Sequence, residues 1–128
     1  ILMSLLNKNS NTIISFGNIK KIHNNIAGIV DFKEFSFFFE SWSKRYFQIN
    51  KKKISFWKNK YKNKRDIYFK NRYYIKGYTS SIDNKKYYTL IIYENSTCFR
   101  NKILEFGSHN FKGIQLIYNT IENILENL

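Results

Sequence analysis

The stretch Ser41–Trp57 constrains the fold most, because its side chains alternate in the manner of two short antiparallel strands. Apolar Phe47 and Ile49 stand two residues apart, and the same spacing resumes at Ile54 after a polar break. A period of two is the pattern of a strand with one buried face. The break Asn50–Lys52 suits a tight turn, because Asn tolerates the left-handed backbone conformation. The stretch therefore predicts a β-hairpin.

Other segments of the chain continue this β pattern. The predicted strands are Ile26–Phe35, one bent strand or two short ones over Arg65–Tyr78, then Lys86–Tyr93, and one or two strands over Cys98–Phe106, with Thr12–Phe16 as a possible short strand. Within Arg65–Tyr78 the core candidates are Ile67, Phe69 and Ile75. The expected connectors are Asn18–Asn25, Glu34–Ser41, Lys58–Arg65 and Thr79–Asn84.

The last segment of the chain changes to a helical period. Apolar residues recur at spacings of three and four, at Ile114, Ile117, Ile121, Ile124 or Leu125, and Leu128, which is one face of an amphipathic helix. Ser108 or Asn110 suits the N-cap, and Gly113 weakens the first turn. The fold class is therefore mainly β, with about seven antiparallel strands followed by one helix. An antiparallel sheet curled into a small barrel has an open end that such a helix can plug.

Two motifs in the predicted hairpin resemble the pleckstrin homology (PH) family. The run Trp42-Ser43-Lys44-Arg45-Tyr46-Phe47 is similar to the second strand of that family, and Ile54-Ser55-Phe56-Trp57-Lys58 to the third. The resemblance implies a PH-like barrel of two near-orthogonal sheets capped by the C-terminal helix over residues 26–128, with residues 1–25 as an N-terminal extension. It departs from the family in the helix, where Leu116 or Ile117 stands near the usual Trp.

The charge of the chain is large and unevenly distributed. The net charge is +13, and residues 42–76 hold 13 Lys and Arg against one acid, Asp66. Residues 103–128 hold one Lys against three Glu. AT-rich codons explain part of an excess of Lys and Asn, but drift alone would spread lysines evenly. The polarity suggests a basic face directed at an anionic partner, either membrane lipid or nucleic acid.

The resemblance also implies a headgroup site at the end of the barrel where the first four strands of the family connect. In PH domains that bind phosphoinositides, basic residues of the first two strands and the adjacent loops hold the phosphates. The positions that match are Lys33, Lys44, Arg45, Lys58, Lys60, Lys62, Lys64 and Arg65. Lys33 stands one residue after the usual strand-one Lys, because Phe32 takes that place. Of the neighbours Lys44 and Arg45 only one can face the site, and the planar fork of Arg45 favours it. Where many binders have a Tyr in the third strand, Phe56 stands here.

The segment Glu34–Ser41 holds three consecutive phenylalanines, Phe37, Phe38 and Phe39. Neighbouring residues of a strand face opposite sides, so all three cannot point into one core. One interpretation is a hydrophobic membrane wedge that enters the acyl region beside a lipid headgroup. The alternative is a longer strand with a bulge and a larger core.

Three functions remain open at this stage. The first is a non-catalytic, peripheral membrane-targeting module on the cytoplasmic leaflet, binding anionic phospholipid (a phosphoinositide or phosphatidic acid) as a monomer. The second is a protein-interaction module on the same fold, with Phe37–Phe39 against the partner. The third and least favoured is nucleic-acid binding: basic residues interleaved with aromatic ones suit single strands, but RNP, KH and zinc-knuckle motifs are missing.

Catalysis and cofactor or metal binding are not expected. His23 and His109 are isolated, the few carboxylates are scattered, and no phosphate-binding loop or nucleophile elbow is present. Cys98 is the one cysteine, which excludes an internal disulfide and predicts a reducing compartment. No apolar run approaches the length of about 20 residues that a spanning helix needs. The start at Ile1, which is not an initiator Met, predicts an excised piece of a longer protein that could itself be an enzyme.

Overall fold

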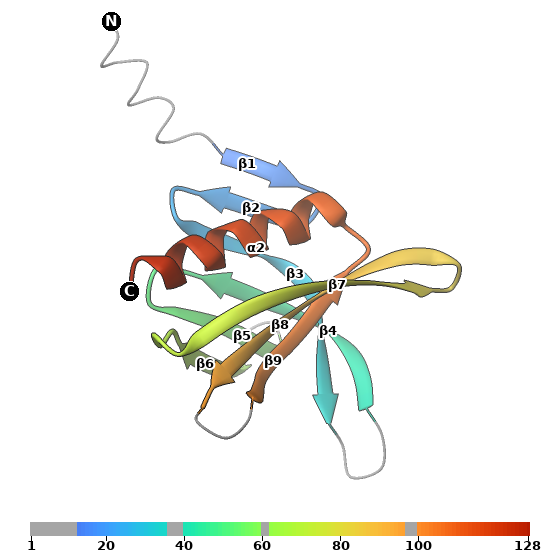
Figure 1. Ribbon diagram of the computed structural model, residues 1–128. Helices are drawn as coiled ribbons and strands as arrows, with labels where there is room; N and C mark the ends of the chain where they lie inside the picture. The colour runs from blue at the N-terminus through green and yellow to red at the C-terminus, as the bar shows by residue number, and fades with distance from the viewer. Residues whose placement is uncertain (1–12, 36–39, 60–61, 97–99) are drawn as a thin grey trace, which may run out of the picture.

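The computed structural model describes residues 13–35, 40–59, 62–96 and 100–128, and the fold over these ranges is mainly β (Figure 1). Nine antiparallel strands and one helix lie within the described ranges. The strands are β1 (Ile13–Phe16), β2 (Ile19–Ile22), β3 (Asn25–Phe35), β4 (Glu40–Ile49), β5 (Lys53–Asn59), β6 (Lys62–Tyr68), β7 (Tyr73–Ile82), β8 (Lys85–Asn95) and β9 (Arg100–Ser108), and the helix is α2 (Phe111–Glu126).

The strands form one open sheet in the order β6-β5-β4-β3-β9-β8-β7. Strand β3 is the branch point, because β4 pairs with one edge while β2 and β9 share the other. Its first residues pair with β2, and Asp31 and Phe32 pair with Gly107 and Phe106 of β9. Over the described residues no register joins β6 to β7, so the sheet stays open.

The chain has more strands than the sequence predicted. Seven of the nine described strands lie within residues 26–128 or begin just before them, and two, β1 and β2, lie in the segment expected to extend before the domain. The polar connector predicted over Asn18–Asn25 is wrong, because Ile19–Ile22 pairs with β3 and Ile19 is buried. Lys20 and Lys21 made this segment look like a connector, although burial of Ile19 alone is enough to anchor β2.

Three other predicted connectors are shorter than expected. Strands β3 and β4 continue into Glu34–Ser41, β5 and β6 continue into Lys58–Arg65, and β7 runs through most of Thr79–Asn84. The turn that joins β7 to β8 is Asp83–Asn84, and both residues have the positive φ that a two-residue hairpin turn requires (54° and 63°). Their composition predicted loops, but the backbones of these residues pair with neighbouring strands.

The turn between β4 and β5 is confirmed at the predicted position. The side-chain oxygen of Asn50 accepts hydrogen bonds from the backbone N–H groups of Lys52 (2.8 Å) and Lys53 (3.0 Å). The backbone of Asn50 also donates to the carbonyl of Lys53 (3.0 Å). These bonds fix the register of the hairpin, in which Phe47 pairs with Phe56 and Ile49 with Ile54.

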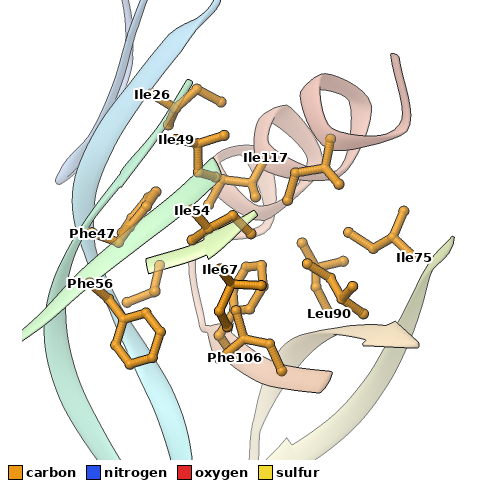
Figure 2. Close-up of a cluster of buried hydrophobic side chains, with 14 of the residues drawn as sticks. Ile26, Phe47, Ile49, Ile54, Phe56, Ile67, Ile75, Leu90, Phe106 and Ile117 are labelled. Atoms are coloured by element: carbon orange, nitrogen blue, oxygen red, sulfur yellow. The ribbon is translucent and has the colours of Figure 1, made fainter. Parts of the chain in front are cut away.

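The core is made by the inner face of the curved sheet, and side chains of strands β2 to β9 contribute to it; Figure 2 shows part of this cluster. Phe47, Ile49 and Ile54 are 1% exposed. The ring of Phe32 stacks on that of Phe56, with centroids 4.5 Å apart, and lies 5.5 Å from Phe106. The predicted core residues Ile67, Phe69 and Ile75 are also buried. Because β6 ends at Tyr68 and β7 begins at Tyr73, the two-strand alternative over Arg65–Tyr78 is confirmed.

Helix α2 covers one end of the curved sheet, on the far side from the β3–β4 and β8–β9 strand ends (Figure 1). The predicted stripe is buried at Ile114, Ile117, Ile121 and Ile124. Asn110 is the N-cap: its side chain accepts from the backbone N–H of Gly113 (3.0 Å) and donates to the carbonyl of Phe16 (2.7 Å). The cap therefore ties the helix to β1.

Gly28 permits the N-terminal hairpin to cross the inner face of β3. A Cβ at this position would collide with the backbone carbonyl of Asn18 and lie 3.0 Å from the Cα of Ile19. Glycine within a strand often marks such a close approach of backbone. Residues of the predicted extension thus pack directly against the first strand of the predicted domain.

We expect Gly28→Ala to lower the free energy of unfolding by about 1–3 kcal/mol, because the added methyl overpacks against backbone that cannot move aside. Urea denaturation followed by circular dichroism measures this change. Gly77→Ala is the matched control, because its Cβ would lie 3.4 Å from the end of the Leu90 side chain and 3.9 Å from the carbonyl oxygen of Thr89, which are ordinary contacts. Equal stability of the two variants would show that the β1–β2 hairpin does not pack on β3.

Candidate functional site

A cavity of about 570 Å³ opens at the end of the sheet where β3 and β5 end and β4 and β6 begin. It is lined by Phe32, Lys33, Glu34, Arg45, Phe56, Lys58, Arg65 and Leu104. We call it the cationic cavity and define it by Arg45, Lys58, Arg65 and Glu34. Phe32, Phe56 and Leu104 form its floor, so the charged groups surround an apolar base.

Strand alternation places each charged group of the cavity. Glu34 stands two residues after buried Phe32, and Arg45 two before buried Phe47. Lys58 stands two residues after Phe56, and Arg65, which pairs with Phe56, stands two before Ile67. Residues two apart share a face of a strand. The inner faces of four neighbouring strands therefore turn from apolar to charged at the same end.

Arg45 is the least exposed cation of the cavity and is held in a fixed position. Its side chain is 13% exposed. Nε donates to Oε1 of Glu34 at 3.0 Å, and a terminal nitrogen lies 2.8 Å from the same oxygen. The other terminal nitrogen donates to the carbonyl of Lys44 at 3.0 Å. An ion pair that is partly shielded from water is stronger than an exposed one, so an incoming anion must compete with Glu34.

Lys58 and Arg65 are the open cations of the cavity. The guanidinium of Arg65 lies 5.8 Å from the centre of the Phe56 ring, an arrangement in which the ring face stabilises the cation. Lys58 is exposed, and no ion pair joins it to another described residue. Together with Arg45 these groups present three positive charges against one carboxylate, an arrangement that suits a ligand with phosphate groups.

Lys33 touches the cavity but directs its ammonium elsewhere. Its Nζ lies 2.8 Å from Glu40 and 3.6 Å from Glu105, and 5.5 Å from the centre of the Trp42 ring. The hydrogen bond to the Glu40 carboxylate raises the pKa of Lys33 and lowers that of Glu40. Lys44 is exposed on the face opposite to Arg45, as expected for strand neighbours.

The remaining predicted site residues lie on the outer face or outside the described part of the chain. The Nζ of Lys64 lies 3.7 Å from Asp66 and 5.7 Å from the centre of the Trp57 ring, away from the cavity. Lys60 and the proposed wedge Phe37, Phe38 and Phe39 lie outside the described residues. Lys62 begins β6, but its side chain is not among those described.

Glu34 is the cavity residue to which the sequence assigned no role. It lies where the predicted strand Ile26–Phe35 and the predicted connector Glu34–Ser41 overlap, and β3 ends at Phe35 as the strand prediction gave it. The available signal was its spacing of two residues from Phe32, which puts both side chains on one face of that strand.

Neither a candidate metal site nor a helix that could span a membrane lies among the described residues. No cluster of three or more His, Cys, Asp or Glu side chains that could hold a metal ion occurs among them. No helix in the described ranges has the length and apolar character needed to cross a membrane.

Comparison of the chain with models of protein families, with curated proteins and with solved structures found no match in any of the three. The geometry of the cationic cavity is therefore the basis for assigning a function.

We expect Glu34→Gln to tighten the binding of tripolyphosphate by about tenfold or more, because it removes the carboxylate that competes for Arg45. Isothermal titration calorimetry at low salt measures the affinity. Glu126→Gln is the matched control: it makes the same change in net charge, but it lies on α2 and does not line the cavity. Equal gains in both variants would mean that only net charge governs binding, and that the cavity is not the site.

Proposed function

We propose that the chain is a non-catalytic module that binds anionic phospholipid at the cationic cavity and thereby docks on the cytoplasmic leaflet of a membrane. The ligand class is a phosphoinositide or phosphatidic acid. The observation that carries the proposal is the convergence of Arg45, Lys58 and Arg65, from three strands, on one cavity with an apolar floor.

The strand order supports a PH-like architecture as part of the proposal. Strands β3–β6 and β7–β9 are two meanders that join where the first of these strands, β3, pairs with the last, β9, and a helix follows. The two halves meet where β3 and β9 pair over only two residue pairs, and a narrow joint of this kind permits a sharp bend between two layers. In a barrel of two near-orthogonal sheets with a helix at one end, the cavity would lie at the other end.

The chemistry of the cavity suits a lipid headgroup with phosphates. A guanidinium fork binds phosphate with two hydrogen bonds, and Arg45 is held by its neighbours before any ligand arrives. Because Glu34 already pairs with Arg45, a ligand must carry enough negative charge to displace the Glu34 carboxylate. A headgroup with several phosphates can replace Glu34 at Arg45 while it contacts Lys58 and Arg65.

Charge and the phenylalanine run add a second, less specific contribution. Each lysine near an anionic membrane contributes about 1 kcal/mol, so the basic stretch over residues 42–76 can draw the domain to the surface. The proposed wedge Phe37–Phe39 joins β3 to β4, the two strands that supply Glu34 and Arg45. A headgroup in the cavity would bring this segment next to the lipid.

The second candidate, a protein-interaction module, is favoured by another part of the fold. Strand β7 pairs only with β8 in the described sheet, so its other edge offers backbone hydrogen bonds. A hollow of about 300 Å³ beside it is lined by Gly77, Tyr78, Phe111 and other residues of β7, β8 and α2. An extended peptide fits an edge of this kind.

We expect the chain to sediment with vesicles that contain a phosphoinositide or phosphatidic acid at physiological ionic strength, about 0.15 M. Arg45→Ala should lower the affinity by about tenfold or more, because charge-assisted hydrogen bonds to phosphate are lost. Vesicles of neutral lipid and vesicles with phosphatidylserine are compared in parallel.

Lys44→Ala is the control for this prediction, because it removes the same charge from the opposite face of the same strand. Its affinity should stay within about threefold of that of the wild type. Equal losses of vesicle affinity in the two variants would show that binding depends on the overall positive charge and not on the cationic cavity. If the wild-type chain does not sediment with any of the anionic vesicles, the proposed function is ruled out.

A further inference from the structure

The outer face of β3–β6 carries apolar and aromatic side chains, of which Ile29, Tyr46 and Tyr68 are exposed and Trp57 is half-buried. Ile29, Tyr46, Trp57 and Lys64 are successive partners across the four strands. Ile29 is 45% exposed and Tyr46 37%, and the Tyr46 and Trp57 ring centroids lie 5.3 Å apart. Tyr68, in the same outer plane of β6, is 55% exposed. Rings arranged this way on a sheet form a platform that the core does not use.

Lysines stand among these rings. The Nζ of Lys64 lies 5.7 Å from the centre of the Trp57 ring, and that of Lys53 lies 5.4 Å from that of Tyr68. Lys44 is exposed on the same side of β4, two residues before Tyr46. Asp66 pairs with Lys53 at 3.3 Å and more distantly with Lys64, so the positive groups outnumber this acid.

A hollow of about 540 Å³ extends from the platform toward β2. Its polar lining includes the cations Lys20, Lys53 and Lys64 and the hydrogen-bonding side chains of Asn25, Gln48 and Asn50. Binding sites for small organic groups have volumes of about 300–1,000 Å³. We name the rings, the four lysines and this hollow together the outer aromatic face.

We propose that the outer aromatic face binds single-stranded nucleic acid. A polyanion with planar rings matches a surface that offers both ring faces and cations: unpaired bases stack on Tyr46, Trp57 and Tyr68, and the phosphates contact the lysines. A duplex keeps its bases stacked inside and cannot use the rings. The charge argues against a second copy of this basic chain as the occupant.

This face is separate from the cationic cavity, although the same strands build both. Arg45, Lys58 and Arg65 point to the inner side, whereas Lys44, Trp57 and Lys64 alternate with them to the outer side. The inference therefore stands without lipid binding, and the two sites can be tested with different variants.

The test is fluorescence anisotropy with a labelled short oligouridylate at low and physiological salt. We expect Tyr46→Ala/Trp57→Leu to weaken binding by about tenfold or more. The control Tyr74→Ala/Tyr78→Ala, which also removes two rings but from β7, should bind within about threefold of the wild type, and so should Arg45→Ala. Lys44→Ala should reduce the slope of log affinity against log salt by about 0.7.

A second readout does not depend on a variant that removes rings. In a Trp42→Phe background the remaining Trp57 reports stacking directly, and its emission should be quenched as oligouridylate is added. Urea denaturation of each variant shows that the fold is retained.

Four results would overturn the inference. The first is no oligouridylate binding by the wild type at low salt, and the second is unchanged binding by the folded Tyr46→Ala/Trp57→Leu variant. The third is equal affinity of the wild type for a duplex of the same length. The fourth is a Tyr46→Ala/Trp57→Leu variant that loses vesicle binding but keeps oligouridylate binding. The last result would assign the face to a membrane.

Discussion

The alternation of side chains along β3, β4, β5 and β6 is the constraint on which the rest of the structure depends. Deep in the sheet the inner positions are apolar and pack under α2, as Phe47, Ile54 and Ile117 show. Near the strand ends the inner positions become charged, at Glu34, Arg45, Lys58 and Arg65. A slip of one residue in any of these registers would bury lysines and expose the core. The energy that holds the core in register therefore also holds the cavity in shape.

The same alternation places basic neighbours on different faces of the sheet. Arg45 and Lys44, like Arg65 and Lys64, are adjacent in sequence but lie on opposite faces of the sheet. A basic stretch that reads as one patch in the sequence is divided into an inner cavity and an outer aromatic face. The ion pair from Glu34 to Arg45 restrains the inner site, and Asp66 restrains the outer one: the hydrogen bond from Ser55 (2.6 Å) lowers the pKa of Asp66 and keeps it charged.

Much of the fold follows from the sequence, because period and turn chemistry are local. The C-terminal helix and the turn at Asn50 were predicted from spacing and residue type, and Asn110, one of two predicted N-cap candidates beside Ser108, is the cap. Strand β2 was not predicted, because Lys20 and Lys21 make it look polar and Ile19 is the side chain it buries most deeply, although it pairs with β1 on one side and β3 on the other. The expected choice of Arg45 over Lys44 for the inner face agrees with the structure. The ion pairs of Lys33 with Glu40 and of Glu34 with Arg45 depend on how β3 pairs with β4, which composition alone does not fix.

Titration of the isotope-labelled chain with a soluble inositol trisphosphate headgroup, followed by nuclear magnetic resonance, tests directly whether the cationic cavity binds a headgroup. We expect saturable shifts at the backbone amides of Glu34, Arg45, Lys58 and Arg65, together with a change in the Arg45 side-chain signal as the headgroup replaces Glu34. Signals of α2 and of the β7 edge should stay in place. Shifts confined to the β7–α2 hollow, or spread over every exposed lysine without saturation, would contradict the assignment of the cationic cavity as a headgroup site.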